Sequence, residues 1–581
     1  MRVGGKWALS GLAASVVLGV LWAGTVSWPV DPSRLAAKLN FGTAPVGGLH
    51  WGRPGRARFT LLPWPTLRIV DFELLDDKNR SVLSAPLAEI GLSPQGLLRG
   101  DFAPLSAKLL NPTALIDLDA ARDGAGQIVA KPTTLLTRVE VQGGVAKLVS
   151  ANLGVDTLIE NVDGWLRWAK ASRPLAFSLA GVWRGEPVAL EGDIASPLGL
   201  RKGKPSRADL KITARPADMG FTGTLSAGGK GSLEGDLTTN IRSLAAVERW
   251  LGLASAPPLA AREIGLQGKV AASSGVLALN EVQLEVGGQR FDGSLSLSRI
   301  AGKTSVSGTL AADGLDISAL LGLPGPILDS SGQWSRQPVI VAPSPTLDLD
   351  LRVSASHATW QGHRLDSAAA SVLQKDQRLT VRLLDSTACQ GQLSGQISIQ
   401  AAPGGLQTEA SASFVNGDIG AVLSEWGVTA YTGRGGYEAT LRAVGASPAA
   451  IARSLTGSAK LELQGGSIEG VNFEEALRRS LRRPLDFARD MEIGQTNFSS
   501  ARAQLEIVDG QAQIVEARLQ GPGAIVQVQG AIDIADRQLR ARIEAVQASA
   551  LGEPSTDAAH LTIGLFGPWT APSIAALANT D

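Results

Sequence analysis

Hydrophobic and polar residues alternate through most of the chain after about residue 60, and many of these stretches contain the phrase apolar-x-Gly-x-apolar. Successive side chains of a strand point to opposite faces, so Leu190, Gly192 and Ile194 are predicted to share one face while Glu191 and Asp193 share the other. Each such strand has an apolar face with a gap at its glycine. The phrase is centred on Gly192, Gly223, Gly235, Gly268, Gly293, Gly308, Gly395 and Gly530.

Large apolar residues flank these glycines and are predicted to line one long apolar surface. They are Leu190, Ile194, Phe221, Leu225, Leu233, Leu237, Phe291, Leu295, Leu393 and Ile397. Turn signals such as Asp163-Gly164 and Asp509-Gly510 separate the alternating stretches and indicate successive hairpins. The pattern predicts a mainly β fold, a long antiparallel meander of roughly thirty strands with a repeated hairpin unit.

Short helical stretches interrupt the alternation. Three of them begin near Arg242, Asp316 and Asp418, each with a capping residue and a glycine or proline at its end. A fourth begins near Phe473 and is strongly basic. A solvated face that neighbouring acidic residues partly neutralise is the ordinary explanation of its arginines, and contact with anionic headgroups is the functional one. These arginines are Arg478, Arg479, Arg482 and Arg483.

The N-terminus carries an uncharged run from Trp7 to Val30 after the basic residues Arg2 and Lys6. A helix of that length would reach about 36 Å, enough to cross a bilayer, with Trp7 and Trp28 near its ends as interfacial aromatics. The run predicts one transmembrane anchor with the rest of the chain outside the cytoplasm. A cleaved signal peptide is the alternative, although the run is long for one and no clear A-x-A site follows.

Composition and motifs exclude several functions. Acidic and basic residues balance at 54 each and aromatic residues make up 5%, so nucleic-acid binding is not expected. The single cysteine, Cys389, is interpreted as a small buried residue, and His357 and His363 lack the further ligands of a metal site. With no nucleotide-binding loop, nucleophile elbow or paired acid and base, no catalytic residue, cofactor or metal is predicted.

The apolar surface is therefore the candidate functional site. The predicted helices are too short to cover so many strands, so the surface must curl into a groove or close into a core against a second layer. A groove filled by acyl chains would solve the same burial problem. The glycines would then leave room for the chains and let the sheet coil, although tight packing against aromatic neighbours explains them locally.

The chain resembles the AsmA family. At its start, the resemblance rests on the strand LPWPTLRIVDFELLDD and on LSPQGLLRG from Leu92 to Gly100; at its end, on Gly567, Pro568, Trp569 and Pro572. Phe41-Gly42-Thr43 stands where the family usually has Thr-Gly-Arg. The resemblance implies a taco-like repeating β-groove, an anchor in the inner membrane, a periplasmic body, and a role in moving phospholipid towards the outer membrane or in outer-membrane assembly.

Four regions are predicted: the anchor over 1–30, an N-terminal helix and strands over 31–133, the central groove over 134–440, and a C-terminal β region with the basic helix over 441–581. Two functions remain open. One is a passive, non-enzymatic conduit for phospholipid. The other is a scaffold with a closed core that binds outer-membrane or periplasmic assembly proteins through a sheet edge.

Overall fold

The protein is described here by a computed structural model. It describes residues 22, 24–31, 50–52, 55–76, 79–100, 103–117, 136–150, 155–169, 173–226, 231–251, 263–273, 275–300, 303–318, 327–339, 343, 345, 347–360, 363–425, 429–480, 494–548 and 560–576. These residues form two compact units, and the chain passes from unit 1 to unit 2 within strand β16 (Val276–Val286). The domain boundaries predicted from the sequence stay predictions.

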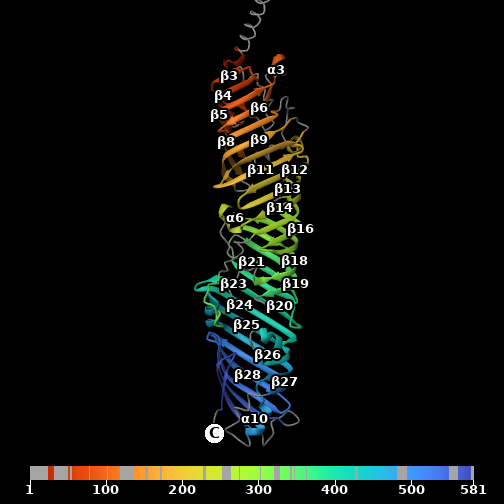
Figure 1. Ribbon diagram of the computed structural model, residues 1–581, viewed down its shortest axis with the longest axis vertical. Coiled ribbons are helices and arrows are strands. Elements are labelled where there is room, and N and C mark those ends of the chain that lie inside the picture. The colour runs from red at the N-terminus through yellow and green to blue at the C-terminus, as the bar shows by residue number, and fades with distance from the viewer. Residues whose placement is uncertain are drawn as a thin grey trace, which may run out of the picture. The chain divides into compact units, whose positions relative to one another are not determined.

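Unit 1 is built from strands that lie side by side, largely in chain order (Figure 1). They are β1 (Trp28–Val30), β2 (His50–Trp51), β3 (Ala57–Thr60), β4 (Thr66–Leu75), β5 (Ser81–Leu92), β6 (Pro104–Leu110), β7 (Thr113–Asp117), β8 (Arg138–Ser150), β9 (Val155–Arg167), β10 (Leu175–Trp183), β11 (Glu186–Ile194), β12 (Ser206–Ala214), β13 (Ala217–Ser226), β14 (Ser232–Ile241) and β15 (Ile264–Ser273).

Unit 2 repeats this organisation (Figure 1). Its strands are β17 (Gln289–Ile300), β18 (Lys303–Asp316), β19 (Leu347–Trp360), β20 (His363–Leu365), β21 (Ser367–Lys375), β22 (Arg378–Ala388), β23 (Gly391–Ala402), β24 (Gly405–Asp418), β25 (Tyr431–Gly445), β26 (Thr456–Glu469), β27 (Gln495–Val508), β28 (Gln511–Gln520), β29 (Ala524–Asp533), β30 (Gln538–Gln547), β31 (His560–Pro568) and β32 (Ser573–Ala576). The prediction of a mainly β, mainly antiparallel fold is confirmed.

The helices are short and lie between strands. They are α3 (Pro94–Leu98), α5 (Pro197–Arg201), α6 (Leu244–Leu251), α8 (Ile419–Glu425), α9 (Pro448–Arg453) and α10 (Phe473–Ser480). Those predicted near Arg242, Asp418 and Phe473 are confirmed as α6, α8 and α10. The helix predicted from Asp316 falls mainly on 319–326, outside the described residues.

Among the described residues, the antiparallel meander that the sequence predicted is broken at β8 and at β19. β8 runs parallel to β6 and β7, and β19 runs parallel to β18. In both cases the connection is long, 118–137 before β8 and 317–346 before β19, which suits a crossover. Alternation alone cannot distinguish a parallel from an antiparallel neighbour, because both put every second side chain on one face.

One turn prediction is also wrong. Asp509-Gly510 does connect β27 and β28, but Asp163-Gly164 lies within β9. There Asp163 Oδ1 accepts a hydrogen bond from the Gly143 N–H at 2.9 Å, and Gly164 has a φ of 147°. A β-carbon at Gly164 would collide with the backbone of Ser178 in β10, so this glycine permits close strand approach and not a turn.

The predicted N-terminal anchor lies mostly outside the described residues, but its predicted end at Val30 is wrong. Residues Trp28–Val30 form β1, which pairs with β3. Pro29 explains the change, because proline lacks the N–H that a helix interior needs and is tolerated in an edge strand. Within the described part of the chain, no helix has the length and apolar character needed to cross a membrane.

Each unit contains a tightly packed core. In unit 1 it lies between β3 and β6 and contains fully buried residues such as Leu67, Ile69 and Ile90. In unit 2 it lies between β24 and β31 and includes Phe473 and Leu477 from α10. The strands between these two cores carry the candidate site.

Candidate functional site

The register of unit 1 aligns the apolar positions of neighbouring strands on one face, which we call the apolar face. Gly192 of β11 lies opposite Phe177 of β10 and Leu210 of β12. Leu210 in turn lies opposite Phe221 of β13, and Phe221 lies opposite Leu237 of β14. Directly opposed residues share a face of the sheet, so the apolar positions of five successive strands form one surface.

All predicted lining residues of unit 1 lie on this face, as the pairing of β11 through β15 shows. They are Leu190, Ile194, Phe221, Leu225, Leu233 and Leu237, together with the predicted glycines Gly192, Gly223, Gly235 and Gly268. The sequence reading missed their neighbours on strands without the glycine phrase: Leu175, Phe177, Leu179, Leu210, Ile212, Leu266 and Val270. Simple alternation along β10, β12 and β15 was the signal that could have found them.

The same face continues towards the start of unit 1. Leu166 of β9 lies opposite both Phe177 and Val139 of β8. Val139 is beside Ala107 of β6, and Ala107 lies opposite Ile90 of β5. The apolar face is therefore continuous with the closed core of this unit.

In unit 2 the register again joins predicted residues that are far apart in sequence. In β17 and β18, Leu295 lies opposite Gly308, and Gly293 lies opposite Leu310. Phe291, two residues before Gly293, is buried. The apolar face continues from β18 to β23 through a series of directly opposed residues. Leu310 lies opposite Val353 of β19, which lies opposite Ala370 of β21. Ala370 lies opposite Leu383 of β22, which lies opposite Gly395 of β23.

The remaining predicted residues follow from this register. Leu393 of β23 lies opposite Phe414 of β24 and packs against the closed core, while Ile397 lies opposite Val381 and Ala410. Gly530 lies opposite Ala541 further along the same unit.

Burial along the apolar face changes with position. In the two cores its residues are buried, whereas Leu190, Ile194 and Leu225 in the middle of unit 1 are only half-buried. In unit 2, Ile397 remains 38% exposed. The face is therefore covered at the core of each unit and only partly covered between β10 and β14 and around β23.

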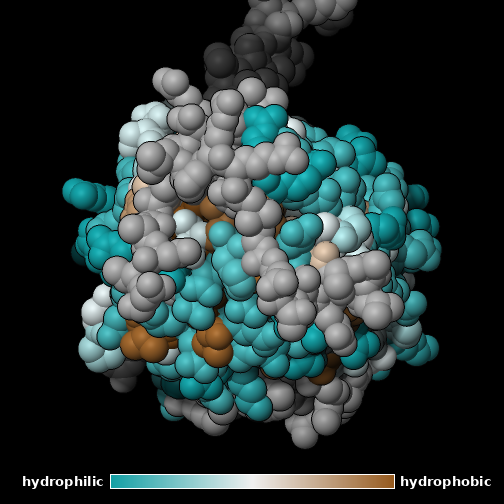
Figure 2. Space-filling model, turned by 90° about the horizontal axis from the view of Figure 1, so that it is seen from below, coloured by the Kyte–Doolittle hydropathy of each residue, from teal (hydrophilic) through white to brown (hydrophobic). Residues whose placement is uncertain are grey.

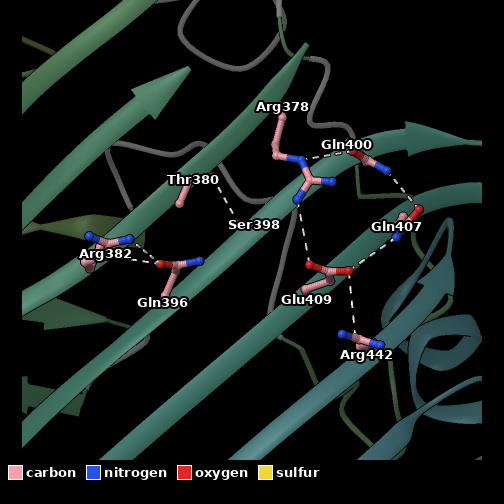
Figure 3. Close-up of polar contacts among 9 residues, drawn as sticks. All are labelled: Arg378, Thr380, Arg382, Gln396, Ser398, Gln400, Gln407, Glu409 and Arg442. Carbon is pink, nitrogen blue, oxygen red and sulfur yellow. Dashed lines mark hydrogen bonds and ion pairs between the residues drawn. The ribbon is translucent and has the colours of Figure 1, made fainter. Parts of the chain in front are cut away.

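The opposite face, which we call the polar face, is covered by its own side chains around β22, β23 and β24 (Figure 3). Arg382 donates through Nε and Nη2 to Gln396 Oε1 at 3.0 and 2.9 Å. Arg378 donates through Nε to Gln400 Oε1 at 3.1 Å, and Gln400 donates to Gln407 Oε1 at 2.9 Å. Cross-strand amide and guanidinium groups thus form a layer over this face.

Glu409 extends this layer to β25. Its carboxylate lies 3.7 Å from Arg378 Nη1 and 3.8 Å from Arg442 Nε (Figure 3). Beneath the layer, the Thr380 and Ser398 hydroxyls are hydrogen-bonded at 3.0 Å. Exposed ion pairs of this kind contribute about 0–1 kcal/mol each, so we assign the layer a covering role and little stabilisation.

At one place in β23, the two faces show the reverse of the burial in an ordinary soluble sheet. Ser398 on the polar face is 5% exposed, whereas Ile397 on the apolar face is 38% exposed. A strand usually turns its apolar face to the core and its polar face to water. Here the polar layer shields its own face, and an isoleucine is left in contact with solvent.

The predicted glycines allow neighbouring backbones to approach closely. A β-carbon at Gly223 would meet the Glu234 carbonyl oxygen and lie 2.6 Å from the Gly235 Cα. It would also lie 2.7 Å from Cζ of Phe221, so the phenyl ring covers the facing pair Gly223 and Gly235. This packing accounts for the burial of Phe221, whereas the other predicted lining residues of unit 1 are half-buried.

The α10 helix closes the core of unit 2, and its arginines are paired with an acidic neighbour. Phe473 and Leu477 are buried against β27, β30 and β31. Arg478 and Arg479 both pair with the Glu475 carboxylate at 2.6 Å. These pairs match the neutralised-face interpretation; Arg482 and Arg483 fall outside the described residues. Seen from this end, the visible described residues are mainly hydrophilic, with hydrophobic groups in small separate patches (Figure 2).

A feature that sequence reasoning missed is the attachment of α6 to the β10–β11 hairpin. The Trp250 and Trp183 rings meet edge to face at 4.9 Å, and Trp250 Nε1 donates to the Trp183 carbonyl at 2.8 Å. Arg184 donates to the Leu251 carbonyl at the helix end. Glu248 is 8% exposed, and its Oε2 has no hydrogen-bond partner among the described residues. A carboxylate is thus buried in α6 beside an apolar sheet.

The described residues contain no cluster of three or more His, Cys, Asp or Glu side chains arranged to hold a metal. His357 lies in β19, but His363 pairs with Trp360, three residues further along that strand. Cys389 is half-buried at the β22–β23 turn and packs against the core of unit 2.

These observations define a repeating, mainly antiparallel β protein whose strand register builds one apolar and one polar face. The AsmA family model matches residues 329–516, about a third of the chain, and this match supports the AsmA family assignment. The start and end motifs that carry the resemblance in the sequence lie outside the matched residues. No curated protein and no solved structure matches the chain.

Proposed function

We propose that this chain is a membrane-anchored, periplasmic lipid-transfer protein that carries phospholipid along its apolar face from the inner towards the outer membrane. The acyl chains lie on the apolar face while the headgroups stay in water. No bond is made or broken, so no catalytic residue, cofactor or metal takes part. The AsmA family assignment is compatible with this role.

The observation that carries the proposal is the partly covered apolar face between β10 and β14 and around β23. Leu190, Ile194 and Leu225 of unit 1 are half-buried and Ile397 of unit 2 is exposed, although within each unit they lie on an apolar surface that the strand register makes continuous. Burial of an acyl chain gains on the order of 0.8 kcal/mol per methylene group. A bound lipid would therefore complete the cover that this part of the sheet lacks.

Photo-crosslinking tests this proposal directly. A photoreactive amino acid at Leu225 or Ile397 should capture phospholipid in cells, because both positions lie on the apolar face. Thr222 provides the matched control, because it lies in the same strand as Leu225 but on the polar face. Capture of neighbouring protein alone at Leu225 and Ile397, or equal lipid capture at Thr222, would contradict the proposal.

The closed cores favour a second candidate, a non-enzymatic scaffold that binds outer-membrane or periplasmic assembly proteins. Leu67 in unit 1 and Ile563 in unit 2 are fully buried, as in an ordinary protein interior. Mass spectrometry of the purified chain separates the two functions. Co-purified phospholipid supports transfer, whereas a lipid-free chain with a stable protein partner supports the scaffold.

A further inference from the structure

At one end of unit 1, several large hydrophobic side chains are unusually exposed to solvent. Trp22, Trp64 and Leu98 are 71%, 70% and 90% exposed, and no other large hydrophobic residue of the described chain exceeds 60%. Leu61 and Trp28 are also exposed. Isolated exposed leucines are common, but several exposed tryptophans at one end of a sheet indicate that this end contacts another surface.

Backbone hydrogen bonds bring the segments that carry these residues together. The N–H groups of Leu61 and Leu62, in the β3–β4 turn, both donate to the Gly24 carbonyl, at 3.1 and 2.7 Å. The Leu92 N–H donates to the Pro65 carbonyl at 2.8 Å, and α3 begins two residues later. The turn and α3 therefore lie at the same end of the sheet, where β3 and α3 are labelled in Figure 1.

The uncharged segment of the sequence that leads to Gly24 indicates which surface these exposed side chains contact. The sequence from Trp7 to Thr25 is uncharged and, as a helix, would span about 28 Å, the thickness of a bilayer core. Because Gly24 is hydrogen-bonded to the turn, the turn must lie within a few ångströms of the end of that apolar segment. Tryptophan prefers the headgroup region, where its ring is buried and its N–H stays near water.

We propose that Leu61, Trp64 and Leu98 form a membrane-contact surface that inserts into the headgroup region of the bilayer holding the predicted anchor. This inference rests on the anchor in the proposed function. Pro63 and Pro65 restrict the backbone on both sides of Trp64, so little conformational entropy is lost when the turn enters the interface. Arg99, exposed next to Leu98, suits the phosphate groups of the same region. The surface would hold the start of the apolar face at the membrane.

The test uses the full chain reconstituted in phosphatidylethanolamine and phosphatidylglycerol vesicles. In a Cys389→Ala background, Trp64→Cys and Leu98→Cys are labelled with an environment-sensitive fluorophore. We expect a blue-shifted emission that lipids with a nitroxide near the headgroup quench. Leu158→Cys is the control, because Leu158 is 48% exposed in the same unit but lies in β9.

The outcomes separate the two proposals. The chain could resist carbonate extraction while the labels at positions 64 and 98 show the same emission and quenching as the label at position 158. In that case the proposed contact surface is wrong, but the predicted membrane anchor is retained. If carbonate releases the chain, the anchor itself is wrong and the inference fails with it. The labels at positions 64 and 98 could instead show blue-shifted emission in native membranes but not in vesicles that contain no other protein. That result would show that a protein covers the surface, and it would also overturn the proposal.

Discussion

At the scale of single residues, exposure and not residue type distinguishes the partly covered apolar face from the core. Ile397 and Ile563 are both isoleucines on an apolar face, yet they are 38% and 1% exposed. Leu393 carries the glycine phrase as clearly as Ile397 does, but it packs against the closed core of unit 2. Ile397 is therefore the better position for separating lipid binding from folding.

Ile397→Asp should lower the free energy of unfolding by about 1 kcal/mol, because the new charge keeps contact with water. Ile563→Asp should cost about 3–5 kcal/mol, because it buries an unpaired carboxylate. Urea denaturation measures both. Equal losses would show that the face around β23 is an ordinary core. Val508→Asp, at an exposed position in β27, controls for the charge itself.

Gly223→Ala should destabilise the protein by about 1–3 kcal/mol, since its methyl group has no space between the β13 and β14 backbones. Gly220→Ala, in the same strand, should cost less because only the Thr238 hydroxyl crowds it, and that side chain can rotate. Thermal denaturation compares the two variants. A Phe221→Leu substitution should not rescue Gly223→Ala, because the Glu234 carbonyl remains in the way.

At the scale of elements, the short helices attach to the sheet through specific contacts. The α10 helix contributes Phe473 and Leu477 to the core of unit 2, and α6 is fixed to the β10–β11 hairpin by Trp250. Of the two, only α6 has a buried residue that is charged, Glu248. Three apolar residues lie at helical spacing around it and are half-buried: Leu244, Val247 and Leu251.

Glu248→Leu should leave the stability unchanged or raise it by about 1 kcal/mol, because it removes a buried carboxylate oxygen to which no described residue donates a hydrogen bond. Arg249→Leu is the matched control, because Arg249 is the next residue of α6 and is exposed. Differential scanning calorimetry measures both variants. A clear loss of stability in Glu248→Leu alone would show that the carboxylate has a partner in solution.

At the scale of the whole molecule, the proposed transfer requires lipid to occupy both units. The apolar face runs through β10 to β15 in unit 1 and through β17 to β31 in unit 2. Under the proposed function, the closed core around α10 requires that lipid released at that end either rearranges packed residues or leaves the face before the core. The proposed function therefore places its most accessible lipid positions between the two cores.

If phospholipid passes along the face from the anchored end, Ile397→Arg should interrupt its movement. A photo-crosslinker at Leu225 in unit 1 should still capture lipid in this variant, while capture at Leu505 in β27 should fall. Pulse-labelled phospholipid in cells provides the measurement. Unchanged capture at Leu505 would mean that lipid reaches this part of unit 2 by another route.

The sequence by itself determined the strand pattern, the two-faced character of the sheet and three of the short helices. These features depend on local spacing, because alternation fixes the face of every side chain. The eight glycines also marked strands of the apolar face, as Gly192, Gly223 and Gly235 illustrate.

Only the tertiary structure decided which parts of that face are covered. The parallel pairings at β8 and β19 and the close backbone contact at Gly164 depend on neighbours distant in sequence. Burial depends on the same neighbours: Leu67 and Leu190 have the same residue type, but only Leu67 has a closed core around it. Residue spacing fixes the direction of a side chain, whereas packing decides whether anything lies over it.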